Sequence, residues 1–141
     1  MVSKFLIAWC LLAVSVTIHA AGLSTMLRRA SSGLRGAGFW PVTWLLVGVA
    51  WSLMLLHLAE ISVWALFFWW QHCLPDAESS FYFSGVTYTT VGYGDLVLPQ
   101  EWRLFGPVEG LTGILMCGLS TGFFFAVVTK FLVAQSISRK A

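Results

Sequence analysis

Three long apolar stretches constrain the fold of this chain more than any other feature. They cover Phe5–Leu23, Phe39–Trp70 and Leu104–Ala134, and each exceeds the roughly 18 residues that a helix needs to cross a bilayer. Only 10% of the residues are charged, whereas soluble domains carry about a quarter. Because lipid offers no hydrogen-bond partners to the backbone, each stretch is expected to be helical. The sequence therefore predicts an all-α membrane protein with three transmembrane helices.

The charges divide between the two sides of such a protein. Six cations lie after the first stretch or at and beyond the end of the third: Arg28, Arg29, Arg35, Lys130, Arg139 and Lys140. Four carboxylates lie between the second and third stretches: Asp76, Glu78, Asp95 and Glu101. Since basic segments stay in the cytoplasm, we expect a cell-membrane protein whose N-terminus lies outside and whose C-terminus is cytoplasmic. Tryptophans at both ends of the second stretch, including Trp64, are expected to form interfacial belts.

The acidic loop contains the sequence Thr-Thr-Val-Gly-Tyr-Gly-Asp at residues 89–95, named here the GYG segment. Rings of backbone carbonyls can replace the water around a dehydrated potassium ion. Gly92 and Gly94 reach positive φ without penalty, so they can turn successive carbonyls to one side. Val91 and Tyr93 alternate with them and are expected to brace the strand, while Thr90 adds a hydroxyl oxygen. The simpler alternative is a glycine-rich turn, which the position between two spans disfavours.

Thr-Val-Gly-Tyr-Gly-Asp resembles the selectivity filter of potassium channels at every position. The resemblance covers roughly residues 40–134 and implies an outer helix, a pore helix, a filter and an inner helix. Small prokaryotic subunits with one extra leading helix are the most similar, which implies a prokaryotic plasma membrane. The resemblance implies potassium ions bound through Thr90, Val91, Gly92, Tyr93 and Gly94. One motif per chain supplies a quarter of a fourfold ring, so a homotetramer is expected.

The residues before the motif are expected to form the re-entrant pore helix. Pro75 suits a first helical turn, and acidic residues at 76 and 78 favour its N-terminal end. The run from there to about Tyr88 is too short to span a bilayer. Thr89 and Asp95 would support the filter from either end. Two further supporting positions depart from the family: Tyr82 replaces a tryptophan that tethers the filter aspartate, leaving that bond in question, and Val86 replaces a glutamate.

The chain divides into four expected parts. Residues 1–26 form an extra N-terminal transmembrane helix, 27–38 a basic cytoplasmic linker, 39–134 the pore domain and 135–141 a short cytoplasmic tail. The alternative for residues 1–21 is a cleaved signal peptide, because a lysine precedes the apolar run and Ile18-His19-Ala20 resembles a cleavage site. Cleavage would place the arginines of the linker outside, against the charge pattern. A retained helix is therefore favoured.

Ionisable residues inside spans are candidates for function. His57 and Glu60 lie three apart on one helix face. We expect Glu60 to bond to the pore domain, with His57 either a pH-sensitive partner or half of a hydrogen-bonded packing pair, the simpler alternative. Glu109 is a third candidate, early in the inner helix. His19, near the end of the first span, is expected to be packed or to snorkel.

Glycines are frequent in the inner helix, where small residues allow helices to pack closely. Gly113 and Gly118 are also candidates for a gating hinge, and Gly113 is favoured. No span carries regularly spaced arginines, so a voltage sensor is not supported, and the gating stimulus is left open.

No catalytic constellation, dinucleotide motif, phosphate loop or metal-ligand cluster is apparent in the sequence. We therefore expect a non-enzyme without a cofactor and without a nucleic-acid partner, whose partners are membrane lipids, potassium ions and three sister chains. The expected function is passive, selective potassium conduction. The rival functions are a poorly selective cation channel and a non-conducting accessory subunit of another channel.

Overall fold

The computed structural model describes residues 2–30 and 39–138. Within them lie four helices: α1 (Val2–Ala30), α2 (Phe39–Trp70), α3 (Ala77–Tyr88) and α4 (Phe105–Ser138). Three of these, α1, α2 and α4, are long and apolar enough to cross a membrane. The shorter α3, of 12 residues, lies below the length that a span requires. The predicted all-α membrane fold is confirmed.

The helix ends follow from local chemistry. Asp76 caps α3, because its carboxylate accepts a 2.7 Å hydrogen bond from the Ser79 amide, which satisfies one of the free donors at a helix start. Pro75 therefore precedes the cap. The expectation that it lies within the first turn of α3 was wrong. The helices α1 and α4 continue through residues 27–30 and 135–138. The rest of the expected linker (31–38) and tail (139–141) lies outside the described residues.

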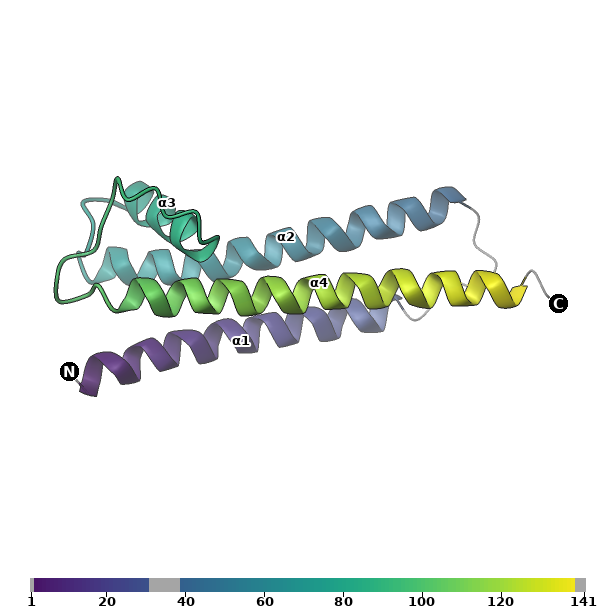
Figure 1. Cartoon of the computed structure of the whole chain (residues 1–141), viewed down its shortest axis with the longest axis horizontal. Coiled ribbons are helices and arrows are strands. Elements are labelled where there is room, and N and C mark those ends of the chain that lie inside the picture. Colours follow the sequence, from purple (N-terminus) through teal and green to yellow (C-terminus); the bar gives the residue numbers. More distant parts are fainter. Residues whose placement is uncertain (1, 31–38, 139–141) are drawn as a thin grey trace.

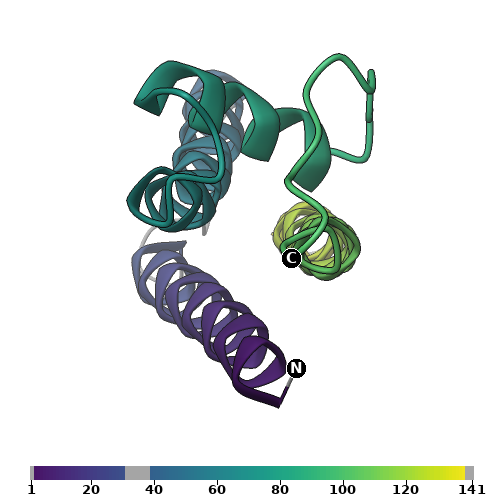
Figure 2. The ribbon, with the colours of Figure 1, turned by 90° about the vertical axis from the view of Figure 1, so that its left-hand side faces the viewer.

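The three long helices run side by side, with α3 and its loops gathered at one end (Figure 1). The start of α1 lies at that same end, and the end of α4 lies at the other (Figure 1). Seen end-on, α1 lies on the side of α2 and α4 away from α3 (Figure 2). It packs against both α2 and α4, and α3 packs against the same two helices. The N-terminal helix therefore reaches α3 only through α2 and α4.

The start of α1 is held beside the loop before α4. The Lys4 ammonium lies 2.9 Å from the Glu101 carbonyl oxygen and 3.3 Å from its carboxylate, and it stacks over the Trp102 ring at 4.3 Å. Exposed ion pairs of this kind contribute at most about 1 kcal/mol, so the lysine orients the helix end more than it stabilises it. Deeper in, Trp64 is fully buried and donates a 3.2 Å hydrogen bond to Ser15 of α1. Trp64 is thus a packing residue, and its assignment to an interfacial belt was wrong.

A glycine sets the distance between α3 and α4. A Cβ atom added at Gly113 would lie 1.9 Å from the Tyr88 carbonyl oxygen, closer than any real side chain can approach. Only glycine allows α4 to pass the C-terminal end of α3 at this distance. The helix α4 is continuous across both Gly113 and Gly118, so a hinge at either position stays a prediction.

Candidate functional site

The φ angles of the GYG segment alternate between the left-handed region and negative values. Thr90, Gly92 and Gly94 have φ angles of 62°, 56° and 78°, while Val91 and Tyr93 between them keep negative φ. In an ordinary extended strand, alternate residues face opposite sides. A left-handed residue at every second position reverses that alternation and brings successive carbonyl groups toward one side. The sequence predicted this conformation for the glycines only; Thr90 adopts it too, although a β-branched residue there is strained.

The amides of this segment point back to α3. Thr90 donates to the Thr87 carbonyl at 3.0 Å, and Val91 and Gly92 donate to the Val86 carbonyl at 3.0 and 3.2 Å. Val86 thus supports the segment through its main-chain oxygen. Over the described parts of the chain, no main-chain amide donates to the carbonyl oxygens of residues 90–94. These oxygens are therefore available to a ligand.

Side chains fix both ends of the segment. At its start, the Thr89 hydroxyl donates a 2.7 Å hydrogen bond to the Gly85 carbonyl and closes α3. At its end, the Tyr82 hydroxyl donates to the Asp95 carboxylate at 2.7 Å, and the Leu96 amide donates to the other oxygen at 3.1 Å. The bond between Tyr82 and Asp95, which the sequence left in question, is therefore present. The hydrogen bond from Tyr82 holds the pKa of the Asp95 carboxyl below its usual range.

The substitution Tyr82→Phe removes the hydroxyl that bonds to Asp95 and keeps the aromatic ring. Since the folded-state pKa of Asp95 is lowered, its stabilisation is present above the ordinary carboxyl pKa of about 4 and is lost as the pH falls through the lowered value. We expect Tyr82→Phe to melt at a lower temperature than the parent at pH 7, and the difference to be smaller at pH 3. Thermal unfolding in detergent at both pH values measures this. An equal difference at pH 3 would show that Tyr82 acts through packing alone.

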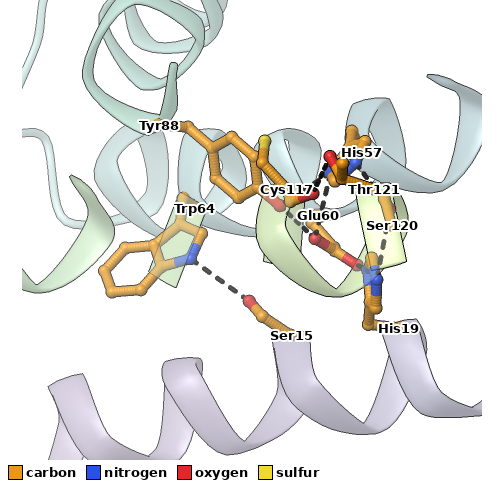
Figure 3. Close-up of polar contacts among 9 residues, drawn as sticks. All are labelled: Ser15, His19, His57, Glu60, Trp64, Tyr88, Cys117, Ser120 and Thr121. Atoms are coloured by element: carbon orange, nitrogen blue, oxygen red, sulfur yellow. Dashed lines mark hydrogen bonds and ion pairs between the residues drawn. The ribbon is translucent and has the colours of Figure 1, made fainter. Parts of the chain in front are cut away.

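A buried polar network, to which all four helices contribute side chains, lies behind the segment (Figure 3). Its centre is the Glu60 carboxylate of α2, which is fully buried. It accepts hydrogen bonds from the Tyr88 hydroxyl at the end of α3 and, at 2.8 Å, from His19 Nδ1 of α1. His57 Nδ1 lies 3.8 Å from the carboxylate and 3.0 Å from the Tyr88 hydroxyl. The expected bond between Glu60 and the pore region is therefore present.

The sequence did not link His19 or Ser120 to this network. His19 is buried, which confirms the packed alternative and excludes snorkelling. The hydroxyl of Ser120 on α4 lies 3.3 Å from His19 Nε2 and 3.0 Å from His57 Nε2 (Figure 3). One signal for His19 was available: Ala8, Ser15 and His19 recur at helical spacing, and all three are buried. Small and polar residues in such a stripe mark a packed face of a membrane helix.

Glu109 occupies a different place from Glu60. It is fully buried, close enough to Ser84 of α3 to interact with it. Neither the Ser84 hydroxyl nor either Glu109 oxygen forms a hydrogen bond of good geometry with the described residues. Polar groups are rarely left in this state inside a fold. Glu109 is therefore not part of the Glu60 network, and its role stays a prediction.

Comparison with protein families identifies the domain that holds these features. The profile of a family described as "Ion channel" matches residues 42–130. The chain belongs to the ion channel family. The matched part of this channel includes the GYG segment, all of α3 and most of α2 and α4, and it leaves out α1. No curated protein and no solved structure matches the chain.

Proposed function

We propose that this ion channel conducts potassium selectively and passively, and that the carbonyl oxygens of Thr90, Val91, Gly92, Tyr93 and Gly94, with the Thr90 hydroxyl, bind the dehydrated ions. The observation that carries the proposal is the backbone of the GYG segment. Its alternating φ angles turn carbonyls to one side, and its amides are bonded back to α3, which leaves those oxygens free. Carbonyl rings of this kind replace the hydration shell of potassium.

A single chain offers carbonyls from one side only, so the proposal requires a ring of four chains. The surface of the chain supports assembly. A groove of about 550 Å³ lies between α3 and the GYG segment, lined in part by Phe81, Tyr82, Val91 and Tyr93. Tyr93 is 71% exposed, which is unusual for a residue that should brace a strand. In the tetramer, a neighbouring chain fills this groove.

The charges of the chain also favour cations. The C-terminal end of α3 leads into the GYG segment, and the negative end of a helix dipole stabilises a nearby cation. Asp76 and Glu78 lie at the N-terminal end of α3, and Asp95 lies at the end of the GYG segment. Hydrogen bonds from Ser79 and Tyr82 lower the pKa values of the Asp76 and Asp95 carboxyls, respectively. Such a carboxylate-rich mouth concentrates cations, and less so at high salt.

Orientation follows from the same proposal. The start of α1 and the GYG segment share one end of the molecule (Figure 1). With the basic segments in the cytoplasm, that end faces outside and the end of α4 faces the cytoplasm. The supports of the filter are Thr89, Asp95, Tyr82 and Val86, through the contacts described above.

Flux through the reconstituted chain tests the proposal. We expect liposomes that contain only this protein to take up potassium down its gradient and to exclude sodium, with a tetramer seen by chemical cross-linking. A potassium-to-sodium permeability ratio near one would instead indicate a poorly selective cation channel. Absence of flux for either ion, with the tetramer formed, would contradict conduction and favour the accessory subunit.

A further inference from the structure

The network around Glu60 contains the donor atoms of a metal site. His19, His57 and Glu60 each place one such atom within 4.8 Å of the others. Two imidazoles and one carboxylate are a ligand set that zinc uses with a fourth position open. Calcium and magnesium require more oxygen ligands than this cluster offers. We infer that this cluster binds a divalent transition-metal ion of the zinc class and that the ion links the N-terminal helix to the pore domain.

The ring nitrogens define where the ion would lie. In both histidines Nδ1 faces the Glu60 carboxylate, at 2.8 Å for His19 and 3.8 Å for His57. In both, Nε2 faces the hydroxyl of Ser120, at 3.3 and 3.0 Å. The ion therefore lies between the two Nδ1 atoms and the carboxylate (Figure 3). A metal-bound histidine almost always donates its other N–H to a fixed acceptor, and here Ser120 is that acceptor for both rings.

A metal ion on the Nδ1 side is compatible with the hydrogen bonds of both rings. If each Nδ1 carries a proton toward the carboxylate, both Nε2 atoms are acceptors. The Ser120 hydroxyl has one proton and two lone pairs, so it satisfies only one of them. With a metal ion on the Nδ1 side, both Nε2–H groups donate to Ser120, which accepts two bonds. An extra proton on one imidazole, or a neutral His57 with its proton on Nε2, also gives Ser120 a bond to each ring. Metal binding is the measurement that separates these explanations.

Two of the three ligand side chains are buried, and the third is partly exposed. The side chains of His19 and Glu60 are 1% and 0% exposed, whereas that of His57 is 20% exposed. Ionisable side chains at such depth in a membrane protein are expensive to place and usually serve a function. His57 provides the open edge through which an ion can enter.

Occupancy of the site would affect the GYG segment through Tyr88. The Tyr88 hydroxyl now bonds to Glu60 and lies 3.0 Å from His57 Nδ1, in the space between the ligand atoms. A bound ion must displace this hydroxyl or take it as a fourth ligand. Tyr88 directly precedes Thr89, the first residue of the segment. We therefore expect the metal to change conduction. This effect on conduction rests on the proposed channel function, whereas metal binding is independent of it.

Metal binding is measured on the full chain, purified without a histidine tag, in detergent and in liposomes. We expect saturable binding of one Zn²⁺ per chain, and with Co²⁺ the visible absorption bands of a four-coordinate ion. His19→Gln and His57→Gln, which keep a polar side chain, should each weaken binding by more than about 100-fold, and Ser120→Ala by about tenfold. His19→Cys should restore binding, because cysteine is a zinc ligand; restored binding also excludes misfolding.

The third histidine of the chain provides a matched control. His72 lies in the loop after α2 and outside the cluster, so His72→Gln should bind the metal like the parent. Absence of saturable binding, binding unchanged in His19→Gln, or binding lost in His72→Gln would each overturn the site. In flux assays, Zn²⁺ should change potassium flux in the parent and not in His19→Gln. The same Zn²⁺ effect in both would overturn the link to the pore, and a parent without flux would contradict only the channel function.

Discussion

Gly94→Ala is expected to abolish potassium flux while leaving the helices folded. Gly94 has a φ of 78°, and Gly92 has one of 56°. A Cβ atom added at either position meets no atom within 4 Å of it in the single chain, so the substitution acts on the backbone conformation alone. An L-residue held in the left-handed region costs roughly 1–2 kcal/mol. The chain escapes this cost by turning the peptide, which moves a carbonyl away from the proposed ion site.

The effect is multiplied by assembly. In the proposed ring of four chains the same strain would occur four times, about 4–8 kcal/mol in total. We expect Gly94→Ala and Gly92→Ala each to reduce potassium flux into liposomes by at least about a hundredfold, since each 1.4 kcal/mol is worth about a factor of ten. Circular dichroism should be unchanged.

Gly48→Ala is the matched control for these variants. Gly48 lies inside α2 with open space around its Cα, where alanine is favoured over glycine by about 0.5–1 kcal/mol. Its flux should equal that of the parent. Normal flux through Gly94→Ala would contradict the assignment of the GYG segment as the ion-binding site.

The parts of this fold that the sequence predicts are those set by local chemistry. The spans follow from uninterrupted apolar runs, and α2 begins and ends at the predicted residues. The approximate start of α3 follows from the acidic residues 76 and 78, although Pro75, expected inside the first turn, lies before the cap. Positive φ at Gly92 and Gly94 follows from the absence of a side chain. Each of these depends on a few neighbouring residues.

The parts that the sequence does not predict depend on which helix faces meet. The span in α1 is apolar almost all round, so hydrophobic contrast does not reveal its packed face. The bond of His19 to Glu60 across 41 residues therefore needed the three-dimensional packing of α1 against α2 and α4. Thr90 in the left-handed region is a similar case, because the strain of a β-branched residue is imposed by bonds to the end of α3.

Gly113→Ala is expected to prevent normal assembly of the pore domain. The new Cβ would lie 1.9 Å from the Tyr88 carbonyl oxygen and 2.8 Å from its carbonyl carbon. Both are backbone atoms, so no side-chain rotation relieves the contact. Overpacking of this kind typically costs about 1–3 kcal/mol, and here α4 must move away from the end of α3. That displacement also disturbs Tyr88, which bonds to Glu60 and directly precedes the GYG segment.

Two glycines on the same helix separate this packing role from a hinge. Gly118 and Gly122 have no atom within 4 Å of an added Cβ in the single chain, so Gly118→Ala and Gly122→Ala should keep the proposed tetramer and its melting temperature. Gly113→Ala should lower the melting temperature or yield monomers on a sizing column. A hinge at Gly113 would give the opposite pattern, since alanine continues a helix readily: a normal, stable tetramer with altered opening. That result would mean that α4 can move away from Tyr88 without loss of stability. The close contact at Gly113 would then not be needed to position the GYG segment.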